Sequence, residues 1–280
     1  MIQFLQDLWS LIKSKQTALL LFTGVAGYAS VAEPLRGGWV PLLGALFLSI
    51  SGATVLNMVY DRDIDAQMAR TRHRPLAAGR LSPGPALALG TLLTAGGLFW
   101  AFLTDLLFGL VVLAGWLLDV VVYTVWLKRR TPWSVLWGGI SGGMPVLAGR
   151  ALALGRIDLV GALLALAVLL WIPTHIMTFS IKYAKDYARA GVPVFPNVYG
   201  QDVTQKVISG STVLAALTMV AVTWLLSLPW GTLGVSFCLG AVLVGLSANA
   251  LIRPSVAVNF RLFKFASVYM VAVMALITVS

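Results

Sequence analysis

Three carboxylates lie within five residues of one another, in a 280-residue chain that has only ten Asp and Glu. The segment reads Asn57-Met-Val-Tyr-Asp61-Arg-Asp63-Ile-Asp65. Asn57, Asp61 and Asp65 are spaced i, i+4 and i+8, so a continuous helix places them on one face, with Asp63 off it. Amide and carboxylate oxygens suit Mg²⁺, which usually binds through one or two carboxylates together with substrate phosphates. The spacing therefore predicts a Mg²⁺ site for a phosphate or diphosphate.

A basic segment follows these acids directly, and a Pro and a Gly mark the turn within it. Its cationic side chains are Arg70, Arg72, His73, Arg74 and Arg80. Arginine makes forked hydrogen bonds to phosphate oxygens, so Arg70 and Arg74 are candidate diphosphate ligands. The alternative is that the acids and arginines only pair with one another and with lipid headgroups. Because the charges are concentrated in one segment, we favour the binding site.

A second segment repeats the order of acid, arginine and Pro/Gly turn further along the chain. It contains Lys182, Lys185 and Asp186. Asp186 could face the first site and serve a second Mg²⁺, and either lysine could contact the diphosphate. The alternative for Asp186 is a salt bridge to Lys182 at i−4. Lys13 and Lys128 are further candidate diphosphate ligands at helix ends.

His175 lies inside an apolar stretch, between Pro173-Thr174 and Met177. An ionisable group at membrane depth is a functional candidate by default. It could bind a haem iron, or it could be a core histidine satisfied by a neighbouring Thr or a backbone carbonyl. Tyr123 and Tyr183 are candidate aromatic site residues, because the face of a ring can stabilise a cation.

The elements that position these residues are membrane spans. Hydrophobic residues make up 59% of the chain and charged residues 11%, and the mean hydropathy is +0.90. A span needs roughly 20 apolar residues, which predicts an all-α, polytopic bundle of about nine transmembrane helices, with eight or ten as alternatives. The predicted spans are Gln16 to Ala32, Val40 to Tyr60, Pro85 to Leu103, Leu107 to Trp126, Ser134 to Leu154, Leu159 to Tyr183, Val207 to Leu228, Thr232 to Ile252 and Asn259 to Val279.

Nine alternating spans divide the 20 Lys and Arg unequally between the two membrane faces. One face carries all of them except Arg36, Arg150 and Arg156. The positive-inside rule then predicts a multi-pass cell-membrane protein with its N-terminus and active site in the cytoplasm and its C-terminus outside. Topology accounts for most of the net charge of +10, so we expect membrane lipids as partners and no nucleic acid.

The spans leave no room for a soluble domain of useful size. We therefore expect one transmembrane domain over residues 1–280, with a possible internal four-helix repeat whose motifs lie near 57–80 and 182–200. Met1 to Lys15 is interpreted as a short amphipathic helix at the membrane interface, not as a cleaved signal. The lone Cys238 excludes disulfides and a multi-cysteine metal site.

These residues resemble the UbiA superfamily of intramembrane prenyltransferases, whose first motif has the form N-x-x-x-D-x-x-x-D. Within it, the stretches 61–79, 123–149 and 175–196 are similar to the protoheme IX farnesyltransferase, or haem O synthase, family. The likeness extends from Lys13 to Gly200. It departs at Thr174, where that family usually has Pro before the histidine, and at Lys185, where an acid is common.

The resemblance implies a UbiA-type bundle and Mg²⁺-dependent transfer of a farnesyl group from farnesyl diphosphate to a vinyl group of protohaem IX, forming haem O. Mg²⁺ would be held by Asn57, Asp61, Asp65 and Asp186, and His175 would hold or orient the iron. One alternative is a prenyltransferase acting on an aromatic quinone precursor or a glycerophosphate lipid. A cation transporter is the alternative from another class, but it would place acids near the membrane midplane and break its helices there.

Overall fold

The structure is a computed structural model that describes residues 2–34 and 38–279, so Arg36 lies outside the described part. All its regular elements are helical. They are α1 (Ile2–Leu11), α2 (Ser14–Ala29), α3 (Trp39–Tyr60), α4 (Arg62–Gln67), α5 (Pro83–Thr104), α6 (Leu106–Trp116), the π-helix η1 (Leu117–Leu127), α7 (Ser134–Leu154), α8 (Leu159–Lys182), α9 (Ala184–Arg189), α10 (Phe195–Leu225), α11 (Trp230–Ile252) and α12 (Val256–Val279).

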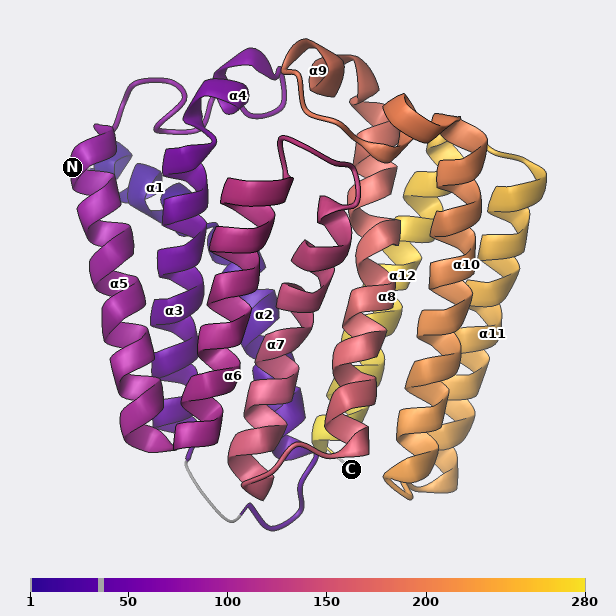
Figure 1. Cartoon of the computed structure of the whole chain (residues 1–280). Coiled ribbons are helices and arrows are strands. Elements are labelled where there is room, and N and C mark those ends of the chain that lie inside the picture. Colours follow the sequence, from indigo (N-terminus) through magenta and orange to yellow (C-terminus); the bar gives the residue numbers. More distant parts are fainter. Residues whose placement is uncertain (1, 35–37, 280) are drawn as a thin grey trace.

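The long helices run side by side in one bundle, as Figure 1 shows. Within the described residues, seven spans are long and apolar enough to cross a membrane, and α6 and η1 count as one of them. The 16-residue α2 and the glycine-rich α7 are the two remaining long helices. The prediction of an all-α membrane bundle of about nine helices is therefore confirmed.

The predicted span boundaries lie close to the observed helix ends except at α10. This helix begins at Phe195 rather than at Val207, and it is interrupted at Gly200, whose φ of 82° is left-handed. Pro196 lies in its first turn, where a missing N–H costs nothing. Hydropathy alone could not show that a helix continues through the polar residues that precede the apolar run.

Two glycine contacts hold α2 against α7. A Cβ added at Gly149 would overlap the carbonyl oxygen of Gly24, and one added at Gly27 would overlap that of Val146. Membrane helices pack closely where small residues let their backbones approach. This close approach lets α2 and α7 pack backbone against backbone, without large apolar side chains between them.

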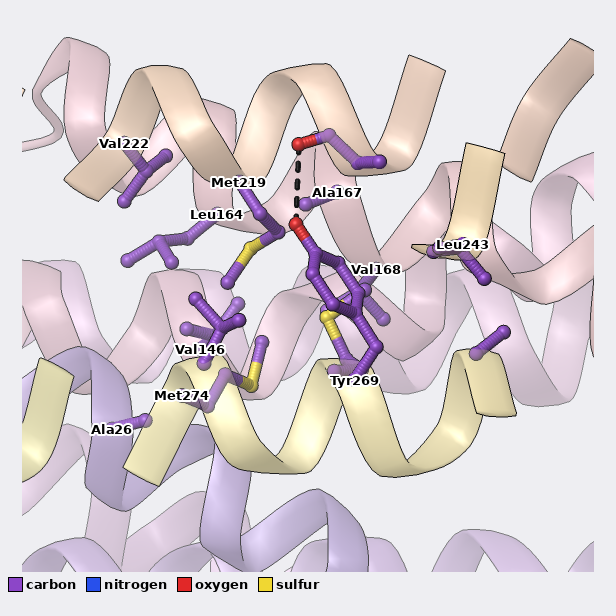
Figure 2. Packing of buried hydrophobic residues seen from close by; sticks show 14 of the residues in the cluster. Ala26, Val146, Leu164, Ala167, Val168, Met219, Val222, Leu243, Tyr269 and Met274 are labelled. Atoms are coloured by element: carbon purple, nitrogen blue, oxygen red, sulfur yellow. Dashed lines mark hydrogen bonds between the residues drawn. The ribbon is translucent and has the colours of Figure 1, made fainter. Parts of the chain in front are cut away.

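The other half of the bundle packs around bulkier side chains contributed mainly by α8, α10, α11 and α12. Figure 2 shows Tyr269 of α12 among Leu164, Met219 and Leu243. Its buried hydroxyl donates a hydrogen bond of 3.2 Å to the carbonyl of Ala216 in α10. A buried hydroxyl needs such a partner, so this bond fixes α12 against α10.

Two short helices, α4 and α9, lie at the same end of the bundle (Figure 1). Each follows a long helix after a single intervening residue: Asp61 separates α3 from α4, and Tyr183 separates α8 from α9. α1 lies near this end too, where Arg80 makes an ion pair of 2.9 Å with Asp7. The hydrogen bonds from Arg80 lower the pKa of the Asp7 carboxyl.

Candidate active site

Asn57, Asp61 and Asp65 form one buried stripe, although α3 formally ends before Asp61. The helical hydrogen bonds continue across the junction, from Asp61 N to the Asn57 carbonyl at 2.9 Å and from Asp65 N to the Asp61 carbonyl at 2.8 Å. The exposed fractions of the three residues are 6%, 0% and 4%. Asp63, off the stripe, is exposed and pairs with Arg129 at 2.7 Å. The i, i+4, i+8 spacing therefore acts as it would in a continuous helix.

A cationic side chain binds each member of the stripe. The contacts are Lys13 Nζ to Asn57 Oδ1 at 3.1 Å, an ion pair of Lys128 with Asp61, and Arg74 Nη1 to Asp65 Oδ2 at 2.7 Å. Burial, together with the charges of Arg74 and Lys128, lowers the pKa of Lys13 to about 8. Six predicted site residues, at positions 13, 57, 61, 65, 74 and 128, thus meet here.

The oxygens of the stripe fit a hard divalent cation. Asp61 Oδ1 is buried and has no hydrogen-bond partner, so it costs free energy unless a ligand compensates it. Within residues 2–34 and 38–279, no group of three or more His, Cys, Asp or Glu could hold a metal by itself. Two carboxylates and an amide suit Mg²⁺, because that ion takes its remaining ligands from water and substrate phosphates.

The π-helix η1 brings Asp119, Tyr123 and Lys128 to the same wall. Its i→i+5 pattern appears in the bond of 2.9 Å from Lys128 N to the Tyr123 carbonyl. A π-helix has about 4.4 residues per turn, so residues four and nine apart share a face. In an α-helix of 3.6 residues per turn, residues nine apart would point in opposite directions. The unusual backbone is therefore what lets Lys128 reach the stripe.

Thr124 connects η1 to the stripe. Its hydroxyl donates a hydrogen bond of 2.7 Å to the Asp119 carbonyl and accepts one of 2.8 Å from Asn57 Nδ2. Thr124 is only 1% exposed. The amide of Asn57 is thereby fixed, with its oxygen turned toward Lys13.

A cavity of about 550 Å³ lies next to the stripe. Its polar side chains at the α4 end are Lys13, Lys15, Asp65, Arg70, Arg74 and Lys128. Its deeper wall is mostly apolar and contains Leu46, Met144, Trp171, Ile172 and Ile176. We call the first group the charged end and the second the apolar chamber. This arrangement can hold an anionic headgroup at one end and an apolar reactant beyond it.

His175 lies in the wall of the apolar chamber. Its ring stacks on Trp171 at 5.1 Å between centroids and lies 4.9 Å from the ring of Phe263 on α12. Its Nδ1 is buried and has no partner. The adjacent Thr174 bonds to Thr212 at 2.5 Å instead. That threonine therefore does not satisfy the histidine, whose Nδ1 is left without a hydrogen-bond partner.

Arg70 links the first segment to the second. It donates a hydrogen bond of 3.4 Å to the Tyr187 hydroxyl of α9, and its guanidinium lies 6.0 Å and 5.7 Å from the ring centroids of Phe179 and Tyr183. Both Arg70 and Tyr187 line the cavity. The two segments predicted to cooperate are therefore in contact.

The other residues of the second segment lie off the cavity wall. Lys182 is exposed, with its ammonium 4.9 Å from the ring centroid of Phe260, and Lys185 is exposed on α9. Asp186 pairs with Arg189 at 3.8 Å rather than with Lys182. Tyr183 stacks on Phe179 outside the lining residues. The structure thus does not bring Asp186 to the stripe.

Sequence reasoning assigned no role to Asp119, Thr124 or Phe263. Asp119 carried a usable signal, since an acid inside an apolar span is a functional candidate. The role of Thr124 depends on the π-helix, which hydropathy does not reveal. Phe263 could not be paired with His175 without knowing that α12 packs against α8.

The chain matches the model of the UbiA prenyltransferase family over residues 19–270. A protein of Thermofilum pendens named protoheme IX farnesyltransferase is 40% identical over 272 residues, which cover 95% of each chain. One of the same name from Korarchaeum cryptofilum is 45% identical over 210 residues, covering 75% of this chain and 71% of the relative. Another, from Symbiobacterium thermophilum, is 38% identical over 251 residues, covering 89% and 84%.

Solved structures share the fold. A digeranylgeranylglyceryl phosphate synthase structure has a TM-score of 0.80 at 19% identity, with 98% of this chain and 97% of the other covered. A UbiA homologue of Archaeoglobus fulgidus, bound to GPP and Mg²⁺, has a TM-score of 0.68 at 14% identity, with 98% and 100% covered. At these identities the likeness concerns the arrangement of helices.

Proposed function

We propose that this chain, which belongs to the UbiA prenyltransferase family and is an intramembrane prenyltransferase, transfers a farnesyl group from farnesyl diphosphate to a vinyl group of protohaem IX and so forms haem O. The observation that carries the proposal is that one cavity has both a charged end and an apolar chamber with His175 in its wall. The names of the relatives agree with this acceptor.

Asn57, Asp61 and Asp65 would hold Mg²⁺, and Asp186 could contribute only after α9 moves toward the stripe. When bound, the ion stabilises negative charge on the departing diphosphate. Lys13, Lys128 and Arg74 already lie on the stripe and would turn their N–H groups to phosphate oxygens. Fixed donors of this kind stabilise the charge that develops as the carbon–oxygen bond breaks. Arg70, half-buried in the same wall, would bind the terminal phosphate.

The apolar chamber would hold the farnesyl chain and the acceptor away from water. Tyr123 lies in its wall, with Lys128 Nζ 5.5 Å from its ring centroid, and could stabilise the allylic cation. His175 would orient protohaem through its iron, using the unpartnered Nδ1. The electron-rich vinyl group would then attack the farnesyl carbon, and addition of water would give the hydroxyethylfarnesyl side chain.

The nearest rival is a family member that prenylates an aromatic quinone precursor or a glycerophosphate lipid. The test is to incubate purified protein with Mg²⁺ and farnesyl diphosphate, together with protohaem, 4-hydroxybenzoate or a glycerophosphate lipid in separate reactions. We expect a product with the mass of haem O only in the reaction that contains protohaem. Chelating Mg²⁺ should abolish that product. Prenylation of the other acceptors alone would overturn the haem assignment. Geranyl and geranylgeranyl diphosphate in parallel reactions establish the chain length.

Spectroscopy tests the acceptor site separately from turnover. Adding protohaem to the wild-type protein should shift the haem absorption band, and His175→Ala should weaken that binding at least about tenfold if the imidazole binds iron. Phe179→Leu in the same helix is the control, because it removes a neighbouring ring without removing a ligand. Equal binding by wild type and His175→Ala would exclude the imidazole as the haem ligand.

Two further features of the whole chain belong to this proposal. The charged end would face the cytoplasm of a cell-membrane protein, as the charge asymmetry predicts. The chain would form one domain built from an internal repeat, which the matching α3–α4 and α8–α9 junctions support.

A further inference from the structure

Asp119 is an acid inside a membrane-spanning helix that the steps above do not use. It lies in η1, eight residues before the helix ends at Leu127, and it lines the cavity. Asp65, the other acid of that wall, pairs with Arg74. In the part of the chain that the structure describes, no ion pair or side-chain hydrogen bond engages the Asp119 carboxylate. A carboxylate at this depth is costly to keep without a use.

The position of Asp119 distinguishes it from the acids of the stripe. Asp61 pairs with Lys128 at the charged end, whereas Asp119 lies about two π-turns deeper on the same face. Burial disfavours the ionised Asp119 carboxylate, whereas the charges of Lys13 and Lys128 favour it. Its carboxylate therefore lies between the charged end and the apolar chamber, beside the space that the reacting carbons would occupy.

The proposed reaction needs a proton acceptor at that place. When the vinyl π electrons form the new bond to the farnesyl carbon, diphosphate leaves and a cation remains on the vinyl carbon next to the porphyrin ring. Water then forms a carbon–oxygen bond with that cation and must lose one proton. In the mostly apolar chamber, a side-chain base next to the water is the group best placed to accept that proton. His175 would be bound to the iron. Of the carboxylates that line the cavity, Asp65 is paired with Arg74, which leaves Asp119.

We propose that Asp119 is a catalytic residue that binds the attacking water and accepts its proton during hydration of the prenylated vinyl group. This inference rests on the proposed haem O synthase function. Without the base, the same cation can lose a proton from carbon instead and form an alkene, which is lighter than haem O by one water. The ratio of hydrated to unhydrated product therefore reports the role of Asp119, and it does not depend on how much protein is folded.

The experiment compares wild type, Asp119→Asn, Asp119→Glu and Asp63→Asn with Mg²⁺, farnesyl diphosphate and protohaem in ¹⁸O-labelled water. Mass spectrometry measures labelled haem O and the unhydrated alkene. For Asp119→Asn, we expect the ratio of the two to fall by about 100-fold, the lower range for general base catalysis. Asp119→Glu should restore part of it. Asp63→Asn is the matched control, because Asp63 is exposed and paired with Arg129, and it should keep the wild-type ratio.

Each other outcome has a definite meaning. A wild-type product ratio in Asp119→Asn overturns the base assignment, whatever its total yield. Lower total yield at an unchanged ratio would show that Asp119 only balances the charge of Lys13 and Lys128. If wild type prenylates other acceptors but not protohaem, the proposed function itself fails and the role of Asp119 fails with it.

Discussion

At the scale of single residues, cationic side chains at the charged end neutralise the buried acids of the stripe. Each side chain of the stripe binds one Lys or Arg side chain, yet Asp61 Oδ1 has no hydrogen-bond partner. Three buried polar groups in a row would destabilise the bundle if they were left alone. The same lysines and arginine that neutralise the stripe are also the groups proposed to bind a diphosphate, so the site would be preorganised for a metal-bound anion.

Thr124 is predicted to position Asn57. In Thr124→Val the Asn57 amide loses its partner, which costs about 1–3 kcal/mol, and turnover should fall about tenfold or more. Thr124→Ser keeps the hydroxyl and should retain most of the wild-type rate. Steady-state rates at saturating and limiting farnesyl diphosphate measure the effect. Equal activity of the Val and Ser variants would mean that the hydrogen bond to Asn57 does not matter.

Much of the stripe could be predicted because helical spacing is local: three residues four apart define a face without tertiary information. The cations that bind it were named as separate candidates, and their pairing required the fold. Asp186 shows the limit of such reasoning. Within its short helix, Asp186 pairs with Arg189. The spacing of residues 182–189 does not predict the direction in which this six-residue helix leaves the helix before it.

At the scale of the elements, packing depends on small residues where α2 meets α7. Gly149→Ala should lower the thermal unfolding temperature in detergent clearly, because the added Cβ meets the Gly24 backbone, which cannot move aside cheaply. Gly245→Ala in α11 is the matched control, since a Cβ there meets nothing within 4 Å. Similar unfolding temperatures for the two variants would contradict the close packing.

The connection between α7 and α8 depends on an ion pair at the end of the bundle opposite the stripe. Arg150 is 7% exposed and binds Asp158 at 2.8 Å and the Ser30 hydroxyl at 2.7 Å. Because Asp158 is partly exposed, Arg150→Met should destabilise the fold by about 2 kcal/mol, less than for a fully buried pair. Chemical denaturation in mild detergent measures this, and adding Asp158→Asn should recover part of the loss. No difference from wild type would show that the pair contributes nothing.

The pKa of Asp158 gives this pair a pH dependence. Burial raises that pKa, but hydrogen bonds from Arg150 and Gly161 outweigh burial and lower it overall. A lowered carboxyl pKa stabilises the fold above the ordinary value of 3.8, and the stabilisation disappears as the pH falls through the lower folded-state value. The difference between wild type and Arg150→Met should therefore shrink in acid.

The spans could be predicted from hydropathy because lipid demands continuous apolar helices. What hydropathy could not show was the π-helix inside the fourth predicted span or the early start of α10 at Phe195. Both depend on backbone geometry. The π-helix matters most for the site, because it places Asp119, Tyr123 and Lys128 on one face that lines the cavity.

At the scale of the whole molecule, charge asymmetry predicts that the active-site end faces the cytoplasm. Arg72→Cys and Arg156→Cys, each in a Cys238→Ser background, place one exposed thiol near opposite ends of the bundle. In intact cells, a membrane-impermeant maleimide should label only the Arg156→Cys protein, and lysis should expose the other. Labelling of Arg72→Cys in intact cells would reverse the proposed orientation.

At all three scales, the proposed function depends on the buried stripe: it would hold a Mg²⁺-bound farnesyl diphosphate next to a chamber that would accept protohaem. The most direct measurement is the rate of haem O formation, by mass, for wild type, Asp61→Ala, Asp65→Ala and the control Asp63→Ala, with and without Mg²⁺. We predict Mg²⁺-dependent haem O from wild type and Asp63→Ala, and rates lowered at least about 100-fold in the two stripe variants. Wild-type turnover by Asp61→Ala and Asp65→Ala would contradict the account.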